Sequence, residues 1–113
     1  MDDRHALKME AMLDAVATRP GVTSTALREQ VRDYAQRLSL DASADPLNVP
    51  PELVAYVRNV TFHAYKVLDE DILSLQKAGY SDDALFEITL SVTMGTARAR
   101  LERGLNALQE AVE

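Results

Sequence analysis

The chain has 113 residues, of which 47% are hydrophobic and 27% charged, a composition typical of one globular domain. Its apolar runs are far shorter than the ~20 residues needed to cross a bilayer, which argues against a membrane protein. The 12 basic and 18 acidic residues give a net charge of −6 without a basic cluster, so we expect no nucleic-acid binding.

Two segments before residue 50 have apolar residues at helical spacing. We expect helices from about Arg4 to Thr18 and from about Thr25 to Leu38. Thr23 and Ser24 precede the second helix and can cap it. The stretch from Asp41 to Val49 contains turn-forming residues without a period, which predicts a loop. The apolar face of the first helix is formed by Met9, Met12, Leu13 and Val16.

Three further helices are expected between residues 50 and 113. The first begins at Pro50 and Pro51, because proline is favoured at the start of a helix. Asp69 can cap the second, which ends near Gly79, and Ser81 can cap the third. The sequence therefore predicts an all-α fold with about five helices in a single domain, residues 1–113.

The last predicted helix changes character along its length. From Leu85 to Met94 it is apolar on nearly every side, as in a helix packed within a core or between subunits. From Leu101 to Val112 the leucines and valine follow the spacing of a coiled-coil seam. Gly95 and Gly104 would allow another helix to approach closely. These features predict a homo-oligomer, although the seam fits equally well a helix docked on its own domain.

Several residue types needed for metal or redox chemistry are missing or scattered. Zinc sites use cysteine or paired histidines, whereas this chain has no cysteine and its two histidines, His5 and His63, are far apart. The run Asp69–Asp71 lacks the glycine and the ligand spacing of a calcium loop. We expect neither a metal nor a cofactor. No apolar signal segment follows Met1, so the cytoplasm is the expected compartment.

Three motifs stand out between residues 50 and 83. They are the Glu52-Leu53-Val54 entry, the run His63-Ala64-Tyr65-Lys66-Val67-Leu68-Asp69-Glu70-Asp71, and Ala78-Gly79-Tyr80-Ser81-Asp82-Asp83 before an apolar helix. With these motifs, residues 50 to about 108 resemble the alkylhydroperoxidase D-like and carboxymuconolactone decarboxylase-like family. The resemblance implies a helical bundle that forms trimers or hexamers. Residues 50–113 would form its core, preceded by a helical pair and loop at 1–49.

The thiol-dependent members of that family use a glutamate, two cysteines and a histidine. At the family's spacing the glutamate is Glu52, whereas Ala64 and Val67 occupy the cysteine positions and Asp71 the histidine position. Lys66 stands between the cysteine positions, where a histidine is common. Because peroxide reduction needs a thiolate and a second thiol to resolve the sulfenic acid, we predict that thiol peroxidase activity is absent.

Two classes of function remain. In the first, the chain is an oligomeric, non-redox binding or accessory protein. In the second, it is an acid-base enzyme, such as a decarboxylase, acting on a small organic acid or a lactone, and its candidate catalytic residues are Glu52, His63, Tyr65 and Asp71. Structural roles compete with these assignments, because Glu52 and Asp71 suit the first turns of helices. The enzyme hypothesis requires Glu52 and His63 to share one cleft.

Overall fold

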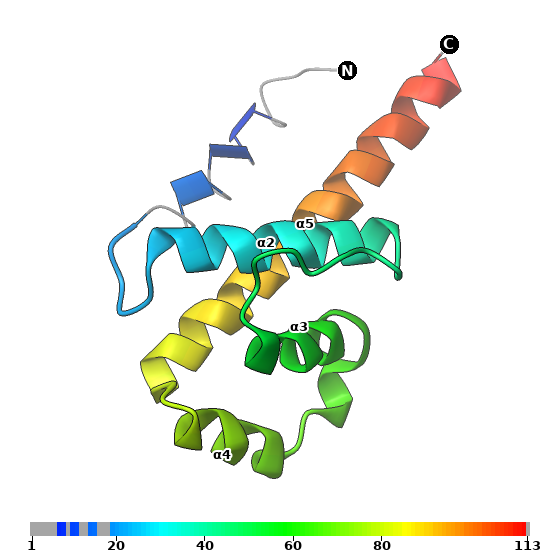
Figure 1. The fold of residues 1–113 in the computed structure, drawn as a ribbon. Helices are drawn as coiled ribbons and strands as arrows, with labels where there is room; N and C mark the ends of the chain where they lie inside the picture. The colour runs from blue at the N-terminus through cyan, green and yellow to red at the C-terminus, as the bar shows by residue number, and fades with distance from the viewer. Residues whose placement is uncertain (1–6, 9, 12–13, 16–18, 113) are drawn as a thin grey trace.

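The computed structural model describes residues 7–8, 10–11, 14–15 and 19–112, and this part of the chain is all-α, as predicted (Figure 1). The elements are α2 (Thr25–Leu40), α3 (Pro51–His63), the 3-10 turn η1 (Ala64–Lys66), α4 (Asp69–Lys77) and α5 (Asp82–Val112). The described residues between 7 and 15 are helical too. The apolar face predicted for that segment, Met9, Met12, Leu13 and Val16, lies outside the described residues.

Of the four residues predicted as helix caps, Ser24 and Ser81 are confirmed. The Ser24 hydroxyl accepts the Leu27 N–H at 3.0 Å, and the Ser81 hydroxyl accepts the Ala84 N–H at 3.1 Å. The prediction for Asp69 is wrong, because Asp69 is already the first helical residue of α4. At the start of α4 the backbone donor is satisfied by the third helical residue, Asp71. Its carboxylate accepts the N–H of Leu68 at 2.9 Å.

The core lies where α2 crosses α5 and α3. Fully buried side chains from these three helices are Val31, Tyr34, Ala35, Leu38, Leu53, Val57, Ile88 and Val92. Each large aliphatic or aromatic side chain among them contributes roughly 1.5–3 kcal/mol by leaving water. A Cβ atom at Gly95 would lie 2.2 Å from the carbonyl oxygen of Arg32. The close crossing of α2 and α5 therefore requires glycine at this position, as the sequence predicted.

The apolar stretch from Leu85 to Met94 serves this core. Leu85, Ile88 and Val92 are buried against the neighbouring helices, whereas Phe86 points outward and is 68% exposed. The stretch is therefore largely used within the chain, because α2 and α3 cover one side of α5. This weakens the reason for expecting a subunit contact at this part of the helix.

The distal half of α5 extends beyond the other helices (Figure 1). The chain measures 52 × 29 × 24 Å and has a radius of gyration of 15.1 Å, above the roughly 13 Å expected for a compact domain of this length. Ion pairs tie the N-terminal segment to α5 and to α2. Arg98 contacts Glu10 at 2.9 Å, and Arg32 on α2 contacts Asp14 at 3.2 Å.

Candidate functional site

A small pocket lies between α3 and α4, in the region of the three motifs. Its volume is about 150 Å³. Glu52, Tyr56 and Asn59 line it from α3, and Asp71 and Ser74 line it from α4. Two of the predicted site residues, Glu52 and Asp71, thus meet at one pocket although they are 19 positions apart in the sequence.

The Glu52 carboxylate is held by a tyrosine that follows α4. The Tyr80 hydroxyl donates a hydrogen bond to Oε1 of Glu52 at 2.7 Å. This hydrogen bond lowers the pKa of Glu52, so its carboxyl is ionised at neutral pH. Burial, together with the hydrogen bond to Glu52 and its charge, raises the pKa of Tyr80 to about 12. The pair fastens the turn after α4 to the start of α3.

The Asp71 carboxylate also has a structural task. Its bond to the Leu68 N–H satisfies a backbone donor at the start of α4, where a negative charge is favoured by the helix dipole. Both carboxylates at the pocket therefore hold the ends of helices. A general base needs a free lone pair facing its substrate, and one oxygen of each carboxylate is already engaged.

The positions that correspond to the family's cysteines lie elsewhere. Ala64 and Lys66 are exposed in η1, and Val67 packs half-buried against the core. None of the three lines the pocket of Glu52 and Asp71. The motif positions therefore do not converge on one reactive centre, and hydrocarbon side chains occupy both thiol positions.

His63 and Tyr65 form a separate surface pair at the end of α3. The Tyr65 hydroxyl lies 3.5 Å from Nδ1 of His63, the two rings meet edge to face, and Tyr65 is 79% exposed. Glu52 lies in the first turn of the same helix, eleven residues before His63. At 1.5 Å per residue this separates them by about 16 Å along the axis. Glu52 and His63 therefore do not share the single cleft that the enzyme hypothesis requires.

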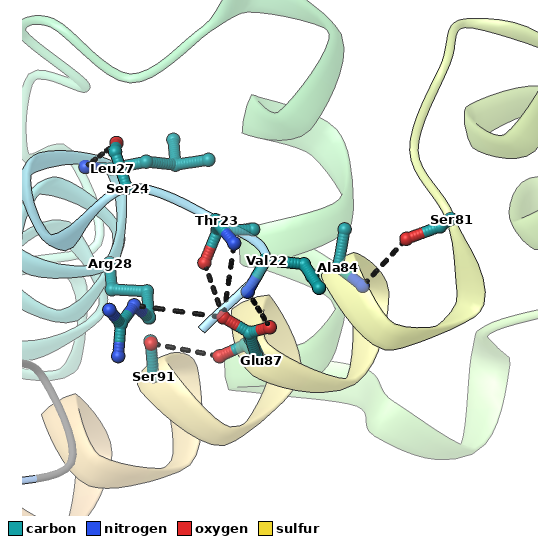
Figure 2. A network of polar contacts seen from close by, with 9 residues as sticks. All are labelled: Val22, Thr23, Ser24, Leu27, Arg28, Ser81, Ala84, Glu87 and Ser91. Atoms are coloured by element: carbon teal, nitrogen blue, oxygen red, sulfur yellow. Dashed lines mark hydrogen bonds and ion pairs between the residues drawn. The ribbon is translucent and has the colours of Figure 1, made fainter. Parts of the chain in front are cut away.

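One polar network of the structure was not anticipated from the sequence. The Glu87 carboxylate of α5 accepts the Val22 N–H at 2.9 Å, the Thr23 N–H at 3.2 Å and the Thr23 hydroxyl at 2.7 Å (Figure 2). Arg28 lies 3.8 Å away. Burial by itself raises the pKa of Glu87, but the hydrogen bonds from Thr23 and Val22 and the Arg28 charge outweigh it and lower the pKa.

This network joins the segment before α2 to α5. A Cβ atom at Gly21 would lie 2.2 Å from a carboxylate oxygen of Glu87, so the backbone passes very close to that side chain. A pocket of about 320 Å³ lies beside it, lined by Arg19, Pro20, Gly21, Arg28, Glu87 and Leu90. No sequence signal indicated Glu87, because a glutamate in the middle of an apolar helical stretch has no local partner. Tyr80 lies within the third sequence motif, where no local pattern marks it as a partner of Glu52.

Neither a family model, a curated protein nor a solved structure matches this chain. Among the described residues, no three histidine, cysteine, aspartate or glutamate side chains are grouped so that they could hold a metal ion. In the same part of the chain, no helix is long and apolar enough to cross a membrane.

Proposed function

We propose that this chain is a self-associating, non-redox binding or accessory protein with an architecture like that of the alkylhydroperoxidase D-like and carboxymuconolactone decarboxylase-like family. One observation carries the proposal. At the motif pocket both carboxylates hold helix ends, and the two thiol positions carry Ala64 and Val67 outside that pocket. The missing cysteines also support the cytoplasm as its compartment.

Support for the resemblance comes from the position of the pocket. Glu52 and Asp71 correspond to the glutamate and the histidine of the family motif, and both line it. The all-α fold agrees with the bundle that the resemblance implies. The departure lies in the chemistry, because an ionised, hydrogen-bonded Glu52 without a thiol beside it cannot reduce a peroxide.

The first experiment measures hydroperoxide reduction by the pure chain, with a thiol reductant supplied. We expect no turnover above the rate without protein. Sustained turnover, abolished by Glu52→Gln, would refute the non-redox assignment. His63→Asn is the matched control, because His63 is exposed and lies outside the pocket.

Self-association is proposed through the distal half of α5. Its seam residues become more exposed toward the end of the helix, from half-buried Leu101 and Leu105 to Leu108 at 44% and Val112 at 70%. Gly104 has no atom within 4 Å of the position of a Cβ, unlike Gly95. A second copy of the chain would cover both the seam and this glycine.

Light scattering tests this contact directly. We expect a mass that is a multiple of the 12.5 kDa chain, reduced to 12.5 kDa by Leu108→Glu. Leu47→Glu is the matched control, because Leu47 is 67% exposed in the loop before α3 and lies away from the seam. A 12.5 kDa mass for the unaltered chain at micromolar concentration would remove self-association from the proposal.

A second candidate, an acid-base enzyme, is favoured only by the open pocket itself, whose polar lining includes Glu52, Asn59 and Asp71. Such an enzyme would not use His63, because His63 does not line this pocket. If lactone or carboxylic-acid substrates are turned over, Glu52→Gln and Asn59→Leu should abolish the reaction and His63→Asn should not. Equal activity in all three variants would exclude this pocket as the catalytic site.

A further inference from the structure

Another polar groove, separate from the motif pocket, lies where three helices meet. Its volume is about 190 Å³, roughly that of six water molecules in the liquid. The last turn of α2 contributes Ser39, and the last turn of α3 contributes Thr61 and Phe62. One face of α5 forms the remaining wall, with Thr96, Ala99, Arg100 and Arg103. It shares no lining residue with the pocket of Glu52 and Asp71.

The charge of this groove is opposite to that of the whole chain. Arg100 and Arg103 both line it, no acidic side chain does, and the protein carries a net charge of −6. Neither arginine forms an ion pair within the described part of the chain, whereas Arg98, two residues before Arg100, pairs with Glu10. Arginines three positions apart on a helix are neighbours and repel each other. An anion bound between them would relieve that repulsion.

Polar groups other than the arginines add to the site. Thr61 lines the groove, and its Oγ1 atom is buried without a hydrogen-bond partner among the described residues. A buried hydroxyl without a partner is unfavourable, but this oxygen atom has no accessible surface, so a ligand in the groove does not reach it. The hydroxyls of Ser39 and Thr96 already donate to backbone carbonyls of their own helices. They can still accept a hydrogen bond.

The groove also has an apolar part, which narrows the choice of anion. The Phe62 ring is 38% exposed, and Arg58 stacks 5.7 Å from its centroid. Ala99 forms part of the same lining. An inorganic ion would leave these groups in contact with water. A carboxylate that carries a small apolar group would use both the arginines and the ring.

We infer that this groove binds a small organic carboxylate through Arg100 and Arg103, with its apolar group against Phe62. Guanidinium groups match carboxylates in shape and charge, and hydrogen bonds between charged partners are the strongest that side chains form. The assignment is independent of the proposed function, because it uses none of the residues of the motif pocket or of the α5 seam. If the carboxylate site is disproved, the proposed function still stands, and the reverse is also true.

Benzoate is the probe, and titration followed by heteronuclear NMR of the full chain is the measurement. We expect saturable shifts of the backbone amide signals of Thr61, Phe62 and Arg100. Benzamide, its neutral counterpart, should produce none of them, and inorganic phosphate should bind at least about tenfold more weakly. Equal shifts with benzamide would overturn the role of the arginines. Phosphate binding as tight as that of benzoate would overturn the organic carboxylate.

Three variants test the residues. Arg100→Gln and Arg103→Gln should each weaken benzoate binding about tenfold or more, because each removes a charged hydrogen bond. Both residues are on a helix face where glutamine is well tolerated, so the fold should persist. Arg19→Gln is the matched control, since it removes the same charge outside the groove, and less than a twofold change is expected. An equal loss in the control would show general charge attraction and contradict the site.

Thr61→Val separates ligand binding from structure. The change removes the buried hydroxyl while nearly keeping the side-chain shape. We expect a higher melting temperature of the free protein with a change of less than twofold in benzoate binding. A tenfold loss of benzoate affinity in this variant would mean that the hydroxyl contacts the ligand, and it would contradict the groove as described.

Discussion

Glycine and glutamate have different roles in two regions of the molecule, the crossing of α2 and α5 and the outer parts. At the crossing, Gly95 is required by a backbone contact, and Glu87 is enclosed by donors from Val22 and Thr23. Toward the ends of the molecule, Gly104 has open space around it, and Glu52 is exposed with a single side-chain donor. Residue type alone therefore does not reveal how strongly a position is constrained. The residues packed around a position determine how strongly it is constrained.

The largest expected effect is at the crossing. Gly95→Leu should lower the free energy of unfolding by about 3 kcal/mol or more, because a side chain cannot fit against the carbonyl of Arg32 unless the helices separate. Chemical denaturation followed by far-UV circular dichroism measures it. Gly104→Leu is the matched control and should leave the fold intact. Similar losses in both variants would mean that α2 and α5 do not cross as described.

The Glu87 network should give the next largest effect. Glu87→Gln keeps the size of the side chain but removes the charge and turns one acceptor into a donor, so we expect a loss of about 1–3 kcal/mol in unfolding free energy. Glu110→Gln is the matched control on the exposed end of the same helix. If both changes have the same effect, the carboxylate does not hold the segment before α2.

The same carboxylate should make stability depend on pH. Its pKa is lower in the folded protein than in the unfolded chain, so its contribution is complete above the unfolded value of 4.5. The contribution is lost as the pH falls below 4.5 and through the folded pKa. Unfolding free energies measured between neutral pH and pH 3 should therefore decrease less steeply for Glu87→Gln than for the unaltered chain. Parallel curves would contradict the shift.

A smaller effect, this time stabilising, is expected from a substitution of Gly104 in the distal half of α5. Gly104→Ala should raise the free energy of unfolding by roughly 0.5–1 kcal/mol, because alanine favours the helix and its methyl group meets no atom of this chain. Gly95→Ala provides the comparison and should be destabilising. A destabilising Gly104→Ala that also lowers the mass in light scattering would indicate that a second copy packs at this glycine.

The smallest effect concerns Tyr80 at the periphery. Glu52→Gln should lower the pKa of Tyr80 from about 12, because the hydrogen bond to the carboxylate and its charge are lost. Burial of the ring should keep it above 10. Ultraviolet titration of tyrosinate measures the change, and Asp71→Asn is the control at the same pocket. An unchanged Tyr80 titration in Glu52→Gln would mean that the two side chains are not bonded in solution.

Much of the local structure was predictable because short-range chemistry determines it. Ser24 and Ser81 cap their helices from the positions that the sequence indicated, and Gly79 ends α4 with a φ of +108° that other residues rarely adopt. Asp69 was predicted to cap α4, but it is the first residue of that helix, and Asp71 two positions later accepts the backbone N–H of Leu68. Several acids in a row compete for one cap, and only the backbone geometry selects Asp71.

Contacts between distant residues were not predictable in this way. The enzyme hypothesis required Glu52 and His63 to share a cleft, but their places on one helix keep them apart. The groove of Arg100 and Arg103 combines three helix segments that are far apart in the sequence, and periodicity carries no information about such convergence. The role of Glu87 depends in the same way on a segment 64 residues earlier.

The amino-acid sequence by itself determined that this protein is helical, where most of its helices begin and end, and that it has no sulfur nucleophile. Those properties follow from side-chain chemistry and from hydrogen bonds between neighbours in the chain. Only the tertiary structure decided which carboxylates hold helix ends and which arginines face a groove. These roles depend on how α2, α3, α4 and α5 pack, and each packing contact joins residues whose separation in the sequence leaves no local pattern.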